Sequence, residues 1–296
     1  PKVDLHRHFE GSLRPETLWE FHQACKQRVH ASLDALRDKL TVPPRSAPGF
    51  LPFLEKFNAL RFRYGGPESL ERLAREAVSD AADDGIVHLE LRSSPVFGAR
   101  RMKETLDPAF SLTHPPSLEE TEAAAEAVVR GARAEAARRG VSVVFILSLN
   151  RSGHAELNRP AAELLARPIG AAFAALDVAG DEAVPLHEVA ELLGPWRAAG
   201  RWLTFHAGED PRGDGAARVR EAVLTWGAHR LGHGVRAAED EETMELLRRR
   251  AVALEVCLTS NVQTQAAPSF AAHPLARLLR SGLRVSLNTD DPAVSG

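Results

Sequence analysis

Short β-rich runs alternate with longer stretches of helical character along the whole chain. The runs predict strands at residues 3–8, 87–95, 141–150, 174–180, 202–209, 229–234, 252–261 and 284–291. The segments between them, such as 69–85, 117–140 and 240–250, contain Ala, Leu, Glu and Arg at the spacing of amphipathic helices. Several of these segments end in glycine just before the next strand, which is the expected stop signal of a helix.

Eight β/α units in one chain of this length predict an α/β fold, a (β/α)₈ TIM barrel that forms a single domain over residues 1–296. The main alternative is an open, doubly wound sheet. Such a sheet would carry a Gly-rich phosphate-binding turn after its first strand, and the sequence has none there. The barrel is therefore favoured.

The connection after the first strand is far too long for a plain crossover. It runs from about Gly11 to Gly85 and contains a proline-rich break at 41–50, so we expect a long helical insertion at this point. After the eighth strand only PAVSG remains. The last barrel helix is thus expected to be absent from this chain, and we expect the natural chain to continue beyond Gly296.

An apolar stripe follows the proline-rich break. In FLPFLEKFNAL the apolar positions at i, i+3, i+4 and i+7 are Phe50, Phe53, Leu54 and Phe57. Such a stripe usually faces the core. The segment also belongs to the first βα loop, however, on the face where barrel enzymes carry their sites. A lid or pocket wall is therefore an equal alternative.

Composition narrows the classes of partner. Apolar content of 44%, charged content of 26% and a net charge of −3 are those of an ordinary soluble protein and indicate neither a nucleic-acid nor a membrane-surface partner. No apolar run reaches the roughly 18 residues of a membrane span. The two cysteines, Cys25 and Cys257, provide neither a disulfide framework nor a thiolate zinc site, so a cytoplasmic location is expected. The oligomeric state is left open.

Two histidines lie one residue apart in the first predicted strand. His6 and His8 share one face of that strand, because side chains at i and i+2 point the same way. This is a metal-ligand arrangement, although such a pair also arises by chance in a chain with twelve histidines. The other strands have to decide between these readings.

Reactive side chains recur at the carboxyl ends of other predicted strands, where barrel enzymes place their catalytic groups. They are His206 and Glu209 on the fifth strand, His233 on the sixth, and Asp290 and Asp291 on the eighth. Any one of them has an ordinary structural explanation, such as a core hydrogen bond or a helix cap. Their repetition on several strands favours one shared site.

The residue types in this set indicate metal-assisted hydrolysis. Three imidazoles and a carboxylate without a thiolate suit Zn²⁺ or another borderline divalent ion and leave a position for water, whose pKa such a metal lowers toward about 7. Glu209, a turn beyond His206, could donate a proton to the substrate. His233 and Asp291 would lie beside the water as base and orienting group.

Two other readings of the same residues are less favoured. Binuclear amidohydrolases also open with His-x-His, but they usually bridge their metals with a modified lysine from mid-barrel, and no lysine follows Lys103. A non-catalytic barrel with a structural zinc ion would not need surplus acid and base residues. A single catalytic metal is therefore predicted.

The stretches VDLHRHFEGSLRPETL, TFHAGED, RLGHG, LEVCLTSNVQT and SLNTDDP, in this order, resemble the adenosine deaminase family of amidohydrolases, most closely its bacterial members. The resemblance spans nearly the whole chain. It implies hydrolytic deamination of adenosine and deoxyadenosine, and thus a small purine nucleoside as the partner. Free adenine and a 5′-modified nucleoside such as aminofutalosine remain alternative substrates.

The resemblance also assigns roles to single residues. It implies one Zn²⁺ per chain, with the ligands His6, His8, His206 and Asp290. Glu209 would protonate the purine ring nitrogen next to the carbon under attack, while His233 and Asp291 would position and deprotonate the water.

The substrate-binding set implied by the resemblance is His8, Glu10, Phe53, Leu54, Phe57, Gly180 and Asp291. Within it, Gly180 would contact the purine through its backbone amide, and the FLEKF segment would form a hydrophobic gate. Glu10 departs from the family pattern, because the adenosine-specific members usually have Asp at this position, which is associated with the sugar end of the substrate. Ribose recognition is therefore the inference that most needs a test.

Overall fold

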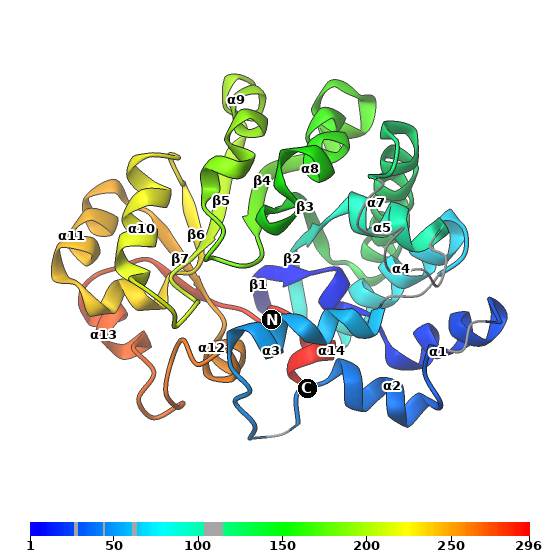
Figure 1. Cartoon of the computed structure of the whole chain (residues 1–296), viewed down its shortest axis with the longest axis horizontal. Helices are drawn as coiled ribbons and strands as arrows, with labels where there is room; N and C mark the ends of the chain where they lie inside the picture. Colours follow the sequence, from blue (N-terminus) through cyan, green and yellow to red (C-terminus); the bar gives the residue numbers. More distant parts are fainter. Residues whose placement is uncertain (27–28, 44, 61–63, 104–114) are drawn as a thin grey trace.

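The structure is a computed structural model. It describes all residues except 27–28, 44, 61–63 and 104–114, and it does not describe the side chains of 101–103. Eight parallel strands follow one another in chain order around the sheet, as predicted (Figure 1). The strands are β1 Lys2–His8, β2 Ile86–Ser93, β3 Ser142–Asn150, β4 Phe173–Ala179, β5 Trp202–Ala207, β6 Arg230–His233, β7 Ala253–Val256 and β8 Val285–Leu287.

The gap between β8 and β1 is bridged at Asp290. The backbone N–H of Asp290 donates to the carbonyl of His6 at 2.9 Å, and the N–H of His8 donates to the carbonyl of Asp290 at 3.0 Å. The Asn288 side chain adds a bond by accepting the N–H of Leu5 at 2.9 Å. The predicted barrel is therefore confirmed, and the segment that completes it lies directly beside the two histidines of β1.

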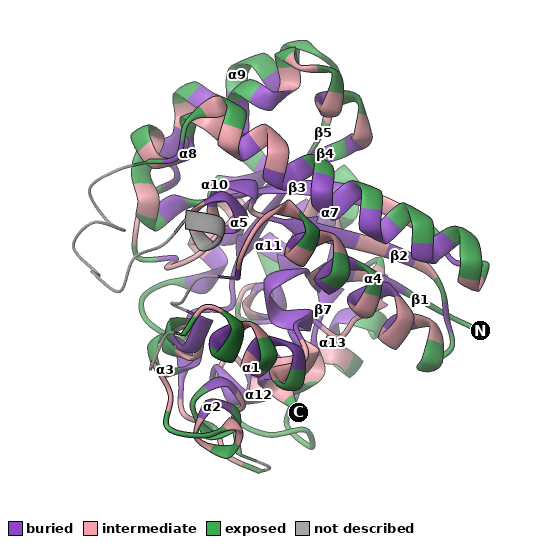
Figure 2. Ribbon diagram, turned by 90° about the vertical axis from the view of Figure 1, so that its right-hand side faces the viewer, coloured by how far each residue is buried: buried purple, intermediate pink, exposed green. Residues whose placement is uncertain are grey.

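Helices surround the sheet, with buried faces toward the barrel and exposed faces outward (Figure 2). They are α1 Pro15–Ala24, α2 Leu33–Leu40, α3 Phe50–Glu55, α4 Pro67–Asp83, α5 Pro95–Lys103, α7 Leu118–Arg139, α8 His154–Glu163, α9 Ala190–Ala198, α10 Gly215–Leu224, α11 Glu241–Arg250, α12 Leu258–Gln263, α13 Leu275–Arg280 and α14 Pro292–Ser295. Among the described residues, no helix has the length and apolarity needed to cross a membrane.

Local signals explain the helix that best matches its prediction. Ser117 and Glu120 form a reciprocal capping box at the start of α7, which satisfies backbone N–H groups that have no partner inside the helix. The helix ends at Gly140, whose φ of 69° lies in the left-handed region that glycine adopts without strain. The glycine stop predicted from the sequence is confirmed here.

The insertion predicted after the first strand is present as α1, α2 and α3. Phe50 and Phe53 of α3 are buried, whereas Leu54 and Phe57 are partly exposed. The guanidinium carbon of Arg212 lies 5.6 Å from the centroid of the Phe50 ring, which brings α3 against the loop after β5. The stripe therefore packs into the protein and also borders the carboxyl end of the barrel.

The residues after β8 include the single-turn helix α14. The backbone N–H of Val42 donates to the carbonyl of Val294 at 2.7 Å. This backbone hydrogen bond ties α14 to the insertion, and the Val294 side chain is buried.

Two strands were predicted several residues too long. Residues 252–261 were expected to form one strand, but β7 ends at Val256 and α12 follows. The Asn261 side chain accepts the N–H of Cys257 at 3.3 Å, so it satisfies a backbone group that a continuing strand would have paired with its neighbour. The predicted strand 284–291 is likewise reduced to β8, because the chain after Leu287 turns toward β1 to close the barrel.

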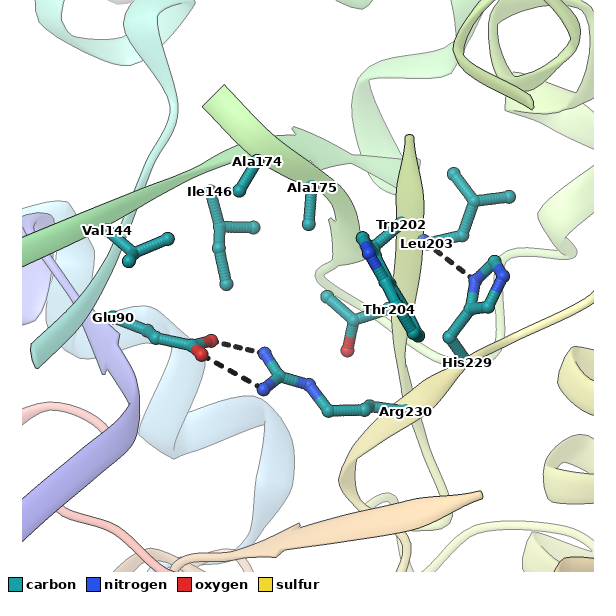
Figure 3. A pocket seen from close by; sticks show the side chains of 10 residues that line it. All are labelled: Glu90, Val144, Ile146, Ala174, Ala175, Trp202, Leu203, Thr204, His229 and Arg230. Atoms are coloured by element: carbon teal, nitrogen blue, oxygen red, sulfur yellow. Dashed lines mark hydrogen bonds and ion pairs between the residues drawn. The ribbon is translucent and has the colours of Figure 1, made fainter. Parts of the chain in front are cut away.

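A cavity of about 340 Å³ opens at the amino end of the barrel strands. Its lining includes Glu90, which forms an ion pair with Arg230, and the exposed Trp202 at the start of β5 (Figure 3). The Arg230 Nε lies 2.8 Å from a carboxylate oxygen of Glu255, farther along the barrel axis. Charged side chains therefore extend from this cavity into the barrel.

Candidate metal and catalytic site

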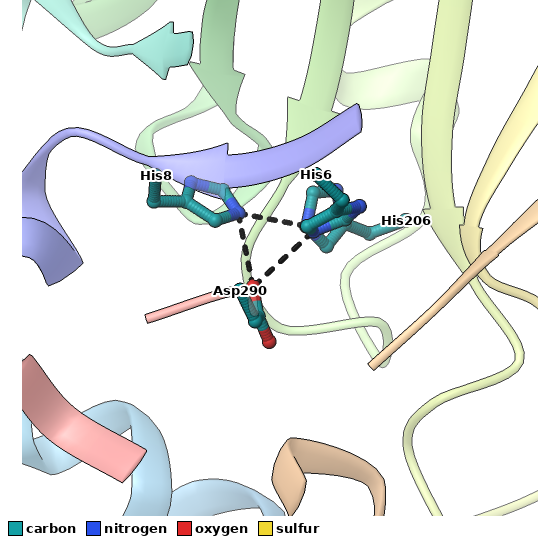
Figure 4. A group of neighbouring side chains, drawn as sticks. All are labelled: His6, His8, His206 and Asp290. Carbon is teal, nitrogen blue, oxygen red and sulfur yellow. Dashed lines mark hydrogen bonds and ion pairs between the residues drawn. The ribbon is translucent and has the colours of Figure 1, made fainter. Parts of the chain in front are cut away.

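Four side chains converge at the carboxyl end of the barrel. They are His6 and His8 from β1, His206 from β5 and Asp290 beyond β8 (Figure 4). Their ligand atoms all lie within 4.8 Å of one another. The His8 and His206 Nε2 atoms are 3.1 Å apart, and Asp290 Oδ1 lies 3.2 Å from His6 Nε2, a buried atom without a well-formed hydrogen bond among the described residues. Three imidazole nitrogens and one carboxylate oxygen in such a cluster fit a zinc ion.

Buried carboxylates orient two of these imidazoles. His6 Nδ1 lies 2.8 Å from Glu255 Oε2, and His206 Nδ1 lies 3.0 Å from Asp177 Oδ1. Each bond places the imidazole proton on Nδ1 and leaves Nε2 free to bind a metal, which is how carboxylates support metal-binding histidines in proteins. Both rings are therefore held in the orientation that a metal site requires.

One buried arginine joins the two carboxylates. Arg92 Nη2 donates to Glu255 Oε2 at 2.7 Å, and Arg92 Nη1 lies 3.5 Å from Asp177 Oδ2. Burial alone would raise the pKa of both carboxyls. For Glu255 this effect is outweighed by the charge of the Arg92 guanidinium, and for Asp177 it is outweighed by His206 and the same guanidinium. Both pKa values therefore lie well below their usual range. The two groups are thus carboxylates that can accept hydrogen bonds.

Gly232 of β6 provides the space in which the imidazoles meet. A Cβ atom at this position would lie 2.7 Å from His6 Cε1 and 3.3 Å from His206 Cγ. Both distances are shorter than ordinary van der Waals contact, so only glycine fits here without displacing a ring.

Cys257 lies near the same cluster and was not expected to bind a metal. Its Sγ falls within 4.8 Å of ligand atoms of His233 and Asp290. Burial raises the pKa of this thiol well above its usual range, and the thiolate is the form that binds metals. The set of three histidines and Asp290 is therefore the better metal site.

Glu209 and His233 form a polar pair next to the metal site. His233 Nε2 lies 3.3 Å from Glu209 Oε2, while Ser260 Oγ donates to Glu209 Oε1 at 3.3 Å. Burial, with the negative charges of Asp290 and Glu182, raises the pKa of Glu209 well above its usual range. This shift favours the protonated carboxyl, which is the form that a general acid needs.

Asn261 selects one tautomer of His233. Its side-chain oxygen accepts the N–H of Cys257, which directs its amide nitrogen toward His233 Nδ1, 3.0 Å away. His233 Nδ1 then accepts, so the proton of the neutral ring lies on Nε2. Burial lowers the pKa of His233 well below its usual range, which favours this neutral form.

Asp291 and Glu10 lie close enough to each other, and to Asp290, for their charges to interact. Burial, followed by the charges of Asp290, Glu209 and Glu10, raises the pKa of Asp291 well above its usual range. Glu10 accepts the backbone N–H of Ser94 at 2.8 Å, yet burial raises its pKa to about 7. The loop after β1 packs directly against Asp291. A Cβ on Gly11 of this loop would lie 1.8 Å from Asp291 Oδ1.

The profile of the adenosine deaminase family matches residues 1–296. The chain belongs to this family. The adenosine deaminases of Serratia proteamaculans and Edwardsiella ictaluri are each 36% identical to it, over all of this chain and 84% of theirs. The predicted resemblance is confirmed, and the chain is a family amidohydrolase with a candidate metal site.

Solved structures confirm the same family fold. Adenine deaminase from Arthrobacter aurescens superposes with a TM-score of 0.84 at 26% identity, covering all of this chain and 84% of that one. An amidohydrolase from Burkholderia ambifaria with bound zinc superposes with a TM-score of 0.80 at 25% identity, covering all of this chain and 76% of that one. A protein with the same fold as this chain therefore binds zinc.

The structure brings together the side chains that the sequence predicted as metal ligands and as acid–base groups. Gly180 follows β4, has a φ of 99°, and lies next to the Asn150 side chain. Asp177, Glu255 and Gly232 were not predicted from the sequence as site residues. A signal for the first two was present, because each is an acid inside an otherwise apolar strand, and a buried charge needs a partner.

Proposed function

We propose that this chain, as one domain over residues 1–296, is a zinc-dependent adenosine deaminase that hydrolyses adenosine and deoxyadenosine to the corresponding inosines and ammonia. The observation that carries the proposal is the placement of Glu209 and His233 beside the cluster of three histidines and Asp290. A structural metal site would not need an acid and an imidazole in direct contact with each other and next to the ligands.

One zinc ion per chain would be held by His6, His8, His206 and Asp290. Zinc bound there would act as a Lewis acid and make water a nucleophile at neutral pH. Burial and the neighbouring His206 lower the pKa of His8 well below its usual range, which favours the neutral imidazole that metal binding requires. The donor set therefore suits the ion without further rearrangement of protons on this ligand.

The residues around the ligands would move the protons. Water adds to the purine carbon that bears the amino group, and Glu209 gives its proton to the adjacent ring nitrogen. The buried Asp291 Oδ1 has no hydrogen-bond partner among the described residues. The positive charge of a bound zinc ion would favour the carboxylate form of Asp291, which would take a proton from the water. His233, with its proton on Nε2, would hold the attacking oxygen by donating to it. The carbon–nitrogen bond then breaks, and the amino group leaves as ammonia with the proton that the water lost. The other proton of the added oxygen returns to Glu209 as that oxygen becomes the carbonyl of the product.

The remaining predicted residues would bind the substrate. We propose that the Gly180 backbone amide contacts the purine and that Phe53, Leu54 and Phe57 border the pocket from α3 and the turn after it. His8 and Asp291 would also face the substrate. Glu10 would accept a hydrogen bond from a ribose hydroxyl, a role consistent with its place two residues beyond His8.

Adenine is the second candidate substrate. A structure of an adenine deaminase superposes closely on this chain, at 26% identity. Glu10 also stands where adenosine-specific members of the family usually have the shorter Asp. Adenine and adenosine differ only in the ribose, so either substrate would undergo the same deamination chemistry.

Initial rates of ammonia release from adenosine, deoxyadenosine, adenine and a 5′-substituted adenosine test this proposal. We expect adenosine to be the fastest of the four. A parent enzyme that prefers adenine would overturn the adenosine assignment and keep the deaminase. No turnover of any 6-aminopurine by the zinc-loaded protein would overturn the deaminase itself.

A further inference from the structure

The buried carboxylate of Glu182 binds the loop that carries Glu209. Its Oε2 accepts the backbone N–H of Gly208 at 2.9 Å, and its Oε1 accepts those of Glu209 at 2.8 Å and Asp210 at 3.3 Å. Glu182 is only 3% exposed and stands two residues after Gly180 in the connection that follows β4. A side chain from one βα loop therefore fixes the backbone of the next.

Successive N–H groups that point to one centre form a concave site for an anion. Gly208 allows this arrangement here because its φ of 77° lies in the left-handed region. Arg218 Nη1 lies 3.5 Å from Glu182 Oε2 and 3.1 Å from Asp210 Oδ2, which adds a positive charge beside the carboxylate. The contacts thus come from the loop after β5 and from α10.

We infer that Glu182 is a positioning residue, which holds the Glu209 side chain at the substrate by binding the backbone of residues 208–210. The inference rests on the proposed function, in which Glu209 is the proton donor. Glu182 itself does not touch the reacting atoms. Glu182 would also connect the Glu209 loop to the turn at Gly180. The distance between the Glu209 carboxyl and the Gly180 amide proposed to contact the purine would then stay constant.

Glu182→Gln is the direct test, because the amide has nearly the same size but only one accepting oxygen. Its nitrogen would face either the N–H of Gly208 or those of Glu209 and Asp210, donor against donor. A small displacement of a catalytic group costs up to about 100-fold in rate, so we expect kcat to fall by about that factor while zinc content stays unchanged. Glu188→Gln is the matched control, since this partly exposed carboxylate lies in the same connection and pairs only with surface histidines among the described residues.

A double-mutant cycle separates positioning from a general structural role. If Glu182 acts through Glu209, then adding Glu182→Gln to Glu209→Gln should lower the residual kcat by less than about twofold. If Glu182→Gln lowered kcat by the same factor in the Glu209→Gln background as in the parent, the inference would be overturned. Glu182→Asp, which keeps the charge but shortens the reach, should retain more kcat than Glu182→Gln, and failure of both variants to fold would assign Glu182 to stability instead.

Amide hydrogen exchange provides a readout that does not depend on turnover. In zinc-loaded Glu182→Gln we expect faster exchange in peptides that cover residues 207–212, with α7 unchanged, because local opening follows the loss of local hydrogen bonds. Unchanged exchange at 207–212 would overturn the inference. If the parent chain deaminates no purine, the proposed function fails, whereas this exchange comparison still decides whether Glu182 holds the loop.

Discussion

Alanine at Gly232 would place a methyl group between two of the candidate metal ligands. The new Cβ would lie 2.7 Å from His6 Cε1, about 0.7 Å inside the 3.4 Å at which ordinary contact begins. His6 cannot move away freely, because its Nδ1 is bonded to the buried Glu255 at 2.8 Å. His206 is constrained in the same way by Asp177. The substitution should therefore displace at least one imidazole from the metal position.

The cost follows from the tolerance of metal sites. Ligand distances in such sites hold to within about 0.2 Å, and disturbing the groups that orient the ligands typically weakens metal binding by about 10- to 100-fold. We expect a loss of this size for Gly232→Ala, or about 1.4 to 2.7 kcal/mol of zinc-binding free energy. The fold should survive, because the change adds one methyl group and removes no hydrogen bond.

Competition with a zinc chelator of known affinity measures this loss directly, for the parent and the variant at one pH. Gly194→Ala in α9 is the matched control, since a Cβ there meets nothing within 4 Å. It should keep the parent zinc affinity. If Gly232→Ala bound zinc as tightly as Gly194→Ala does, the space at Gly232 would not be what permits the site, and the proposed ligand geometry would be wrong.

The other predictions concern the metal count, the acid and Glu10. Elemental analysis of the gently purified protein should find one zinc ion per chain, and two ions or none would contradict the single site. Glu209→Gln should keep the zinc but lose about 10²- to 10⁴-fold in kcat, the usual contribution of a general acid, and a variant within threefold of the parent would reassign the role. Glu10→Gln should weaken turnover of adenosine while leaving any turnover of adenine nearly unchanged, because a ribose hydroxyl would lose its acceptor; equal losses on both substrates would place Glu10 in support of the metal site. The pKa of Glu10 rises from 4.5 to about 7 on folding, so the folded state binds more protons and stability should fall as the pH rises between these values. In zinc-free protein Glu10→Gln should therefore raise the free energy of unfolding at pH 8 by up to about 3 kcal/mol and have little effect at pH 4, which denaturant unfolding at both pH values would check.

The barrel and the candidate ligands could be predicted from the sequence because both depend on local patterns. The alternation of β-rich runs with helical segments identifies the order of the strands, and a parallel barrel then places all their carboxyl ends on one face. His6 and His8 share a strand face through their spacing alone. The chemistry of the site follows, since His206 and Asp290 also stand at strand ends.

The tertiary structure decided which groups control that chemistry. Glu255 reaches His6 across 249 positions and Arg92 across 163, and such contacts depend on strand register, which no local pattern encodes. The Asn261 side chain reaches His233 because the chain leaves β7 at Val256 and enters α12. The sequence pattern predicted a continuous strand over 252–261 and did not reveal this change. A buried polar group must find its partner wherever the folded chain places one, and for that reason these partners become visible only in three dimensions.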